Sequence, residues 1–499
     1  MKLARLIGVL AVAALAPACT VGPDYSRPSA PVPAQYKEAG WKVGEPLDGI
    51  DRGAWWSIYR DPVLDGLERQ IDISNQNLKA AAAAFQQAEW IVAQARAGFF
   101  PIGDVNASAQ RSRTGGGSSS TTGFGRSGFI SNVFSTSASA SWVPDLWGKI
   151  RRTVESDVAS AQVSAGDLAT ARLSAQGALA SDYLQLRVAD ELKRLLDATA
   201  KAYAESLRIT RNQYAVGAAS QSDVAQAETQ LRSTEAQAIA VGVTRAQLEH
   251  AIAVLIGKPP AELSIAPTEV VTEVPDIPAG LPSALLERRP DVAAAERRMA
   301  AANAQIGVAV AAFYPTITLS AAYGVSSSLI NKLFIDQARF WAFGSSLVET
   351  VFDAGARNAI VKEALAFFDQ TIANYRQTAL TAFQQVEDQL AAQRILAQEA
   401  ATQAAAVTSA REAVRIINNQ WLAGTVNYTS VVVAQATALA NEETALNIRQ
   451  SRLVASAALI QDLGGGWDVT QVPSRERIEE EAPLNFSPLP PSISEVRDK

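Results

Sequence analysis

The chain has 499 residues, more than one compact domain usually holds, so we expect several domains or one elongated body. Its formal net charge of −6 argues against nucleic acid as a partner, because phosphate binding needs a basic face. With one Cys and one His, the chain cannot form an internal disulfide, and no metal site or bound cofactor is expected. Nucleophilic catalysis would depend on His250 alone, which lies within a helical stretch, so a hydrolase is not favoured.

The first residues predict export. Lys2 and Arg5 precede an apolar run at 6–15, so we interpret 1–18 as a signal peptide. The lone Cys19 at its end resembles a bacterial lipobox, which implies a covalent lipid on Cys19 and a lipidated arm over 19–61. Ala16 stands where that pattern usually has Leu, so ordinary cleavage after Ala18 is the alternative. Thr20, rather than Asp, favours delivery to the outer membrane over retention at the inner membrane.

An internal repeat organises the mature chain. The run Ala97–Pro101 returns 214 residues later as Ala311–Pro315, and Asn212–Gly217 returns 207 residues later as Asn419–Gly424. Repeats this long indicate duplication of a structural unit. We assign 62–258 to the first repeat, 259–289 to a Pro-rich linker and 290–466 to the second repeat. The last residues, 467–499, are predicted to be an equatorial segment or a disordered tail.

Each repeat begins with a helix followed by a pair of strands. The predicted helices are 62–98 and 290–312, and each ends at an aromatic pair followed by Pro. Alternation of apolar and polar residues predicts a β-hairpin at about 101–145 and another at about 315–350. Residues 115–123 are predicted to form an exposed loop. Four aromatic residues are expected at the membrane interface, with burial inside an assembled sheet as the alternative: Trp142, Phe340, Trp341 and Phe343.

A long helical hairpin follows each pair of strands. The first is predicted over about 147–214 and 221–257, and the second over about 353–421 and 428–463. Gly217 and Gly424 are predicted to form the turns, because glycine favours the left-handed backbone conformation. Helices this long need neighbours from other subunits for burial. Four strands leave two open edges, which three copies would close as a barrel of about twelve strands.

The chain resembles the outer membrane factor family, the TolC-like channels, and within it the lipoprotein branch called NodT-type efflux subunits. The resemblance rests on five runs, which occur in order along the chain: Cys19–Pro28, Trp55–Trp56 in the N-terminal arm, Pro144–Lys149, Glu287–Val292 and Ala423–Tyr428. It implies an α+β membrane protein: a homotrimer with a transmembrane β-barrel, a long α-helical barrel in the periplasm and an equatorial domain. It also implies that periplasmic membrane-fusion adaptors dock at the helical tips and that an inner-membrane pump, often of the resistance–nodulation–division type, supplies energy.

The same resemblance places a gate at the periplasmic tips, where family members carry rings of acidic residues. Asp223 matches such a position, but Ser430 and Val433 stand at the corresponding places in the second repeat. A weakly charged gate formed by Asp223, or by Asn427 and Tyr428, is therefore expected. The alternative for Asp223 is an acid that stabilises a helix N-terminus. The turn residues Gly217, Gly424 and Thr425 are expected to form the adaptor-docking tips.

The predicted function is a passive outer-membrane channel, the exit duct of an efflux pump for small molecules. The same fold can serve type I protein secretion, and the cargo cannot be deduced from the residues of the pore wall. A soluble periplasmic coiled-coil scaffold is an alternative from another class. Recovery of the protein in the aqueous periplasmic fraction would favour that scaffold.

Overall fold

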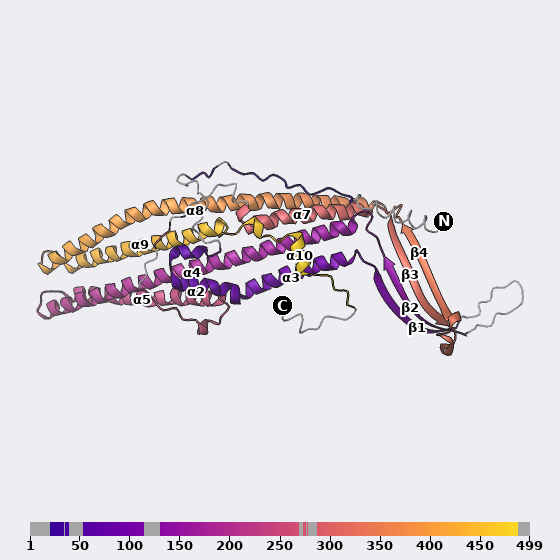
Figure 1. The fold of residues 1–499 in the computed structure, drawn as a ribbon. Coiled ribbons are helices and arrows are strands. Elements are labelled where there is room, and N and C mark those ends of the chain that lie inside the picture. Colours follow the sequence, from indigo (N-terminus) through magenta and orange to yellow (C-terminus); the bar gives the residue numbers. More distant parts are fainter. Residues whose placement is uncertain are drawn as a thin grey trace.

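The computed structural model describes residues 20–33, 35–38, 53–113, 130–268, 273–275, 277 and 287–487. Within these ranges, long helices extend in one direction and a curved sheet projects from one end of the helical body (Figure 1). The signal peptide, Cys19, the predicted loop 115–123, much of the linker and the last twelve residues lie outside the described residues.

The first half begins with the 3₁₀ helix η2 (Trp55–Tyr59) and α2 (Pro62–Ser74), whose first turn is capped by the Asp61 carboxylate. The chain continues through the elements α3 (Gln76–Ala97), β1 (Ile102–Arg113), β2 (Ile130–Trp142), α4 (Lys149–Ala215) and α5 (Gln221–Leu255). Helix α4 has 67 residues, which at about 1.5 Å per residue spans about 100 Å.

From α7 onward, the described residues of the second half repeat the order that begins with α3 in the first half. Its elements are α7 (Pro290–Ala311), β3 (Thr316–Ser327), β4 (Arg339–Val348), α8 (Ala356–Leu422) and α9 (Tyr428–Asp462). Short 3₁₀ helices lie in the connections: η3 (Pro260–Glu262), η4 (Ile330–Lys332), η5 (Asp336–Ala338) and η6 (Val469–Gln471). Helices α8 and α4 both have 67 residues, and α9 and α5 both have 35, so the duplication is preserved in the lengths of the helices.

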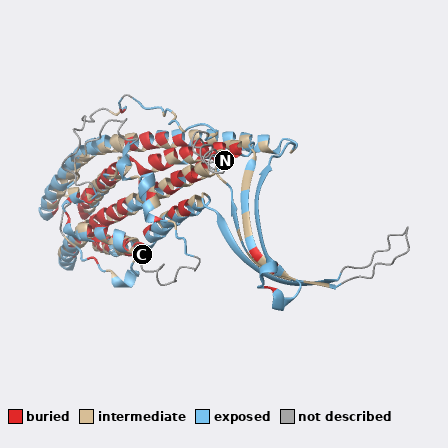
Figure 2. Cartoon of the chain, turned by 45° about the vertical axis from the view of Figure 1, so that its right-hand side comes forward, coloured by how far each residue is buried: buried red, intermediate tan, exposed pale blue. Residues whose placement is uncertain are grey.

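The four strands form one antiparallel sheet in the order β1-β2-β3-β4. The two hairpins come from different repeats and join through β2 and β3, where Ala140 pairs with Ala321. The sheet is largely exposed in the single chain, whereas buried residues are concentrated in the helical body (Figure 2). The predicted α+β class, with long helices and a small antiparallel sheet, is confirmed.

Several apolar clusters hold the helices together. The largest surrounds Trp55, Tyr183 and Leu184, and joins η2, α2, α4, α5 and α9. Small residues allow close packing where helices cross: the Gly166 Cα faces Ala294 of α7, and Gly177 lies against the Gln461 side chain of α9. Alanine and glycine at these crossings let backbones approach, which explains an alanine-rich sequence with a well-packed centre.

One predicted helix is divided into two. The sequence favoured a single helix over 62–98, but α2 ends at Ser74 and α3 starts at Gln76. Asn75 is extended at φ −60° and ψ 122°, and its side-chain oxygen accepts the Leu78 N–H at 2.9 Å. Its amide nitrogen donates to the Leu255 carbonyl at 2.7 Å. The end of α5 therefore fixes the break, a tertiary contact that local periodicity does not report.

The described part of the C-terminal segment packs on the helices. Helix α10 (Arg475–Glu481) buries Ile478 among residues of α3 and α4, including Val92 and Val154. Arg96 on α3 forms an ion pair with Glu479 at 3.4 Å. Residues 475–481 therefore belong to the helical body, while 488–499 lie outside the described residues.

Within the described residues, α5 is the helix whose length and composition would suit a bilayer span, with a mean hydropathy of 1.2 over 18 residues. Only 17% of that window is buried in the single chain. Because α5 is antiparallel to α4 and contains many alanines, we interpret its exposed apolar surface as a packing face for another helix.

Candidate functional site

The sheet has two chemically different faces. Strand register places Val105 opposite Ala138, Ala138 opposite Tyr323, and Tyr323 opposite Trp341, so these residues share one face. The other face carries rows of small polar side chains from all four strands: Asn106, Ser108, Ser135, Ser137, Ser139, Thr316, Thr318, Ser320 and Ser346. An apolar face and a polar face on an exposed sheet match the lipid side and the water side of a transmembrane barrel wall.

Register also separates the predicted interface aromatics. Trp142, Trp341 and Phe343 lie on the apolar face, and the Trp341 and Phe343 rings are 5.8 Å apart. The indole nitrogen of Trp142 donates to the Phe99 carbonyl at 3.0 Å. Phe340 pairs with Gly324 and lies on the polar face. Phe340 therefore does not belong with the predicted aromatic residues of the membrane interface, because alternate residues of a strand point to opposite sides.

Both edges of the sheet are open in the described part of the chain. Strand β1 pairs only with β2, and β4 pairs only with β3. Twelve residues of β1 and ten of β4 thus present one unpaired row of backbone polar groups each. Such edges are not stable in a bilayer, where each unsatisfied group costs several kcal/mol, so the sheet requires further strands.

The helical hairpins end in two matching turns. Gly217 has φ +74° and Gly424 has φ +73°, as predicted for left-handed helix ends. Ala218 N–H donates to the Gln213 carbonyl at 2.8 Å, and Thr425 N–H donates to the Gln420 carbonyl at 2.9 Å. The repeats therefore use one hydrogen-bond pattern to reverse the chain, and both turns are exposed at the end remote from the sheet.

The predicted gate residues have different surroundings. The Asp223 carboxylate accepts the Ser220 N–H at 2.9 Å and the Ser220 hydroxyl at 2.7 Å, and the Ser220 hydroxyl accepts the Asp223 N–H at 3.2 Å. This reciprocal capping box gives Asp223 a local role at the start of α5. Asn427 is the N-cap of α9, the place that Ser220 has in α5, and its side-chain oxygen accepts the Ser430 N–H at 3.1 Å.

Tyr428 is buried between the two hairpins. Its ring centre lies 5.3 Å from that of Trp421, and both residues belong to a cluster with Tyr203 and Leu207 of α4. Beside this cluster, α5 and α9 form a groove of 700 Å³ lined mainly by small and amide side chains, including Gln226, which accepts a hydrogen bond from Thr429 at 3.2 Å. Tyr428 thus connects the hairpins within one chain and does not lie exposed in an opening.

The N-terminal arm binds at the junction of helices and strands, a contact that periodicity did not predict. Val21 N–H donates to the Trp147 carbonyl at 3.1 Å. The buried Arg152 guanidinium donates to the Val21 and Gly22 carbonyls, each at 3.2 Å, and pairs with Asp24 at 2.8 Å. Thr20 lies directly against Gly148, where an added Cβ would meet the Thr20 Cα at 2.9 Å.

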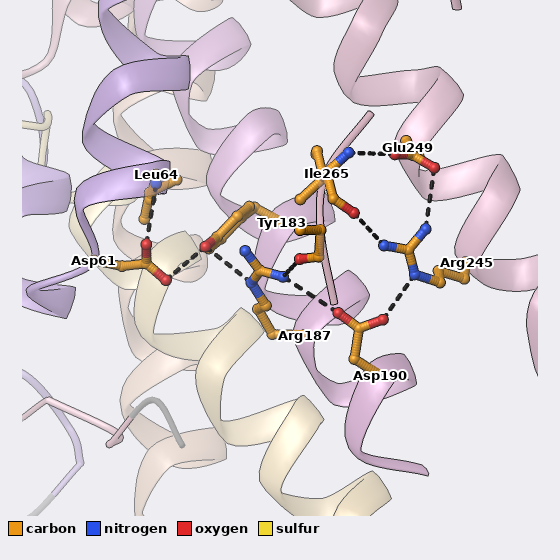
Figure 3. A network of polar contacts seen from close by, with 9 residues as sticks. Asp61, Leu64, Tyr183, Arg187, Asp190, Arg245, Glu249 and Ile265 are labelled. Carbon is orange, nitrogen blue, oxygen red and sulfur yellow. Dashed lines mark hydrogen bonds and ion pairs between the residues drawn. The ribbon is translucent and has the colours of Figure 1, made fainter. Parts of the chain in front are cut away.

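A second unpredicted feature is a buried polar network around Asp190 (Figure 3). The Asp190 side chain is 3% exposed and accepts hydrogen bonds from Arg187 at 3.2 Å and from Arg245 at 2.7 Å. Arg187 also donates to Tyr183, whose hydroxyl donates to the helix-capping Asp61 at 2.6 Å. Through these contacts α4 is joined to α5 and to the start of α2.

Metal binding and histidine-dependent catalysis are considered next for the described residues. Among them, no group of three or more His, Cys, Asp or Glu side chains is arranged to hold a metal ion. His250 is exposed on α5. The residues that carry geometry suited to a function are therefore those of the sheet, the helical tips and the arm.

The model of the family described as "Outer membrane efflux protein" matches residues 68–258 and 281–465. The chain is 29% identical over 468 residues to the toluene efflux pump outer membrane protein TtgC of Pseudomonas putida, covering 93% of this chain and 96% of that protein. It is 30% identical over 464 residues to the solvent efflux pump outer membrane protein SrpC, also of Pseudomonas putida, covering 91% and 96%.

Among solved structures, the outer-membrane channel OprN is similar with a TM-score of 0.81 and 27% identity, over 90% of this chain and 100% of that one. The two matched segments of the family model correspond to the two repeats, and the break between them lies in the Pro-rich linker. The predicted resemblance is confirmed: the chain belongs to the outer membrane efflux protein family and is an outer-membrane channel component of an efflux pump.

Proposed function

We propose that three copies of this chain form a lipid-anchored exit duct that conducts small toxic molecules passively from the periplasm to the exterior. The observation that carries the proposal is the two-faced, four-stranded sheet with open edges at the end of helices about 100 Å long. Joining β4 of one copy to β1 of the next would satisfy both edges and place the serine and threonine rows around a water-filled pore.

The lipid anchor is proposed at Cys19. Its support is the neighbouring residue Thr20, which lies against Gly148 just after the end of β2. Nearby, the Trp147 and Tyr314 rings are stacked at 5.0 Å, and the Trp147 indole nitrogen donates to the Pro315 carbonyl at 2.7 Å. A lipid attached one residue before Thr20 would leave the chain at the boundary between helices and strands, which suits the inner leaflet of the outer membrane.

The exposed turns at Gly217 and Gly424 are the proposed docking points for a periplasmic membrane-fusion adaptor, which would connect the duct to an inner-membrane pump. The groove between α5 and α9 supports this, because Gln226, Gln230 and Gln237 present amide groups that a helical partner can bind. The adjacent exposed Thr425 lies within the second turn.

For the gate, we propose that contacts between the hairpins control the opening at the tips. Trp421 at the end of α8 and Tyr428 at the start of α9 pack on α4, so separating this hairpin from α4 would remove their burial. Asn427 holds the start of α9 next to Tyr428. Asp223 is engaged in its capping box, which favours a positioning role over a role as a charged ring.

Deletion of the gene tests the function. We expect the strain to become more susceptible to organic solvents and small apolar antibiotics, and re-expression of the full chain to restore resistance. The proteins in the culture medium of the deletion strain and of the parent strain are compared in parallel. If a protein is missing from the medium while the susceptibility of the strain is unchanged, type I protein secretion is favoured. Unchanged susceptibility to every compound and an unchanged medium would contradict the proposal.

A further inference from the structure

Charge is distributed unevenly between the sheet and the rest of the chain. The whole chain carries a formal charge of −6, yet residues 102–142, from the start of β1 to the end of β2, contain three arginines and one acidic residue, Asp104. Residues 316–348 contain Lys332, Asp336 and Arg339, which adds one further positive charge. The sheet and its connections are therefore basic in an acidic protein, which indicates an anionic partner at this end.

The arginines lie on one face of the sheet, at the end of its apolar band. Arg111 and Arg113 follow Val105, Ala107 and Ala109 on the apolar face of β1, at the end of the strand remote from the helices.

Arg339 is the first residue of β4 and lies on the same face, where register aligns it through Val325 and Thr136 with Ala107 of β1. It pairs with Val325 and precedes Trp341 and Phe343 on the same apolar face. On β2 the same face carries Asn132 and Ile130 opposite Arg111 and Arg113, and on β3 it ends at Ser327. The lipid-facing surface thus changes from apolar to basic at the two edge strands.

These guanidinium groups are available to a ligand. Arg111 and Arg113 are exposed, and neither has an ion-pair partner within the described ranges. Arg339 pairs with Asp336 at 3.1 Å, but its side chain is 57% exposed. By contrast, at the helix-proximal end Arg357 is shared between Asp353 at 2.7 Å and Glu349 at 3.2 Å. In the described sheet, the arginines without an ion pair, Arg111 and Arg113, therefore lie at the far end of the apolar face.

We propose that Arg111, Arg113 and Arg339 bind the phosphate groups of a phosphorylated glycolipid in the outer leaflet of the membrane. This inference rests on the proposed function, because it needs the apolar face to lie in a bilayer with the helices in the periplasm. Guanidinium groups bind phosphate oxygens in a bidentate manner, and basic residues at the headgroup level attract anionic lipids.

The edge positions of these residues extend the site across subunits. Arg111 is on β1 and Arg339 is on β4, the two strands that would meet between neighbouring copies. Arg111 and Arg113 are two residues apart on one strand, which separates them by about 7 Å. A ligand with two phosphate groups on a sugar backbone can therefore contact Arg111 and Arg113 together, whereas a single phosphate of a glycerolipid reaches fewer of these groups.

Native mass spectrometry of the purified full-length mature protein in mild detergent tests the proposal. The probes are a diphosphorylated acyl-disaccharide (lipid A), its dephosphorylated form, phosphatidylglycerol and inorganic phosphate. We expect lipid A to bind about tenfold or more tightly than the dephosphorylated form, and the R111Q/R113Q/R339Q variant to lose that preference. The matched control R208Q/R232Q/R415Q removes the same charge from exposed positions on α4, α5 and α8 and should keep it.

The proposal would be overturned if the R111Q/R113Q/R339Q variant kept its preference for lipid A over the dephosphorylated form. An equal loss of that preference in the R208Q/R232Q/R415Q control would also overturn it. Equal binding of phosphatidylglycerol would show a general anionic-lipid surface and would also overturn it, as would displacement of lipid A by millimolar phosphate. The single variants R111Q and R113Q, each with an expected partial loss, replace the triple variant if it does not assemble. Ion conductance is recorded for each preparation, because wild-type protein that conducts nothing would refute the proposed duct independently of lipid binding.

Discussion

Removing the Asp190 carboxylate would leave the buried Arg187 and the partly buried Arg245 without their shared partner. In the Asp190→Ala variant, Arg187 with a side chain 4% exposed and Arg245 with a side chain 18% exposed both lose an ion pair. Loss of one partner from a buried ion pair typically costs about 3–5 kcal/mol, because the remaining charge stays out of water. Arg187 retains its bonds to Tyr183 and the Ala266 carbonyl, which places the expected cost near the lower end of that range.

The control lies on the same helix. Asp197 pairs with Lys193 at 2.8 Å, and both side chains are about half exposed, at 47% and 45%. Such exposed pairs contribute about 0–1 kcal/mol, so Asp197→Ala should be nearly neutral. Both variants remove one carboxylate from α4, and the comparison therefore isolates burial from charge.

The assay is thermal dissociation and unfolding of the detergent-solubilised protein, followed by circular dichroism and by gel mobility after heating at a fixed scan rate. Asp190→Ala should lower the midpoint clearly, while Asp197→Ala stays close to wild type. Equal shifts for the two variants would refute the reasoning, since the network would then add no more to stability than an exposed pair.

Three further predictions concern other parts of the chain. Burial, with smaller effects from Asp72 and Asp65, raises the pKa of Glu68 from 4.5 to about 9. The thermal midpoint of the wild type should therefore fall relative to that of Glu68→Gln as pH rises from 4.5 toward 9. Parallel curves of midpoint against pH for the two proteins would contradict this. Gly22 has φ +93° and lies against Gly307, so Gly22→Ala should detach the N-terminal arm and expose it to limited proteolysis. Gly66 has open space around it, so Gly66→Ala should not. Equal protection of the arm from the protease in both variants would argue against its docking on the helices. Trp421→Ala should raise the ion conductance of reconstituted channels, because the Trp421 side chain is only 8% exposed between the hairpins. The control is Tyr214→Ala at the equivalent position of the first repeat, which is 48% exposed and should leave conductance unchanged. Identical conductance of the two variants would show that the aromatic contact is not part of the gate.

The sequence predicted the features that depend on local pattern. Period-two alternation located the strands, and Gly217 and Gly424 located the helical turns, since left-handed backbone geometry selects glycine. The division at Asn75 was not predicted, because it depends on a hydrogen bond to Leu255, which is 180 residues away. The prediction also grouped Phe340 with Trp341 and Phe343 because all three are aromatic, although neighbouring strand residues must face opposite sides.

The contacts of the candidate sites were harder to predict for the same reason. An aspartate at position 223 fits both a gate acid and a helix-capping residue, and only its hydrogen bonds to Ser220 distinguish the two roles. The partners of Asp190 come from α4 and α5, 3 and 55 residues away, so no single sequence window contains them. Arg152 pairs with Asp24 of the arm, which is 128 residues away, so this contact also lies outside any local window.

Disulfide cross-linking between neighbouring copies tests the central claim most directly, because closure must bring β4 of one subunit beside β1 of the next. Val105→Cys on β1 is combined in turn with Trp341→Cys, Phe343→Cys, Ser345→Cys or Leu347→Cys on the same face of β4. A disulfide needs Cα atoms about 4.4–6.8 Å apart, so one register should react best. We predict a covalent trimer for that pair after mild oxidation in membranes; monomers alone for all four pairs would contradict closure of the sheet by three copies.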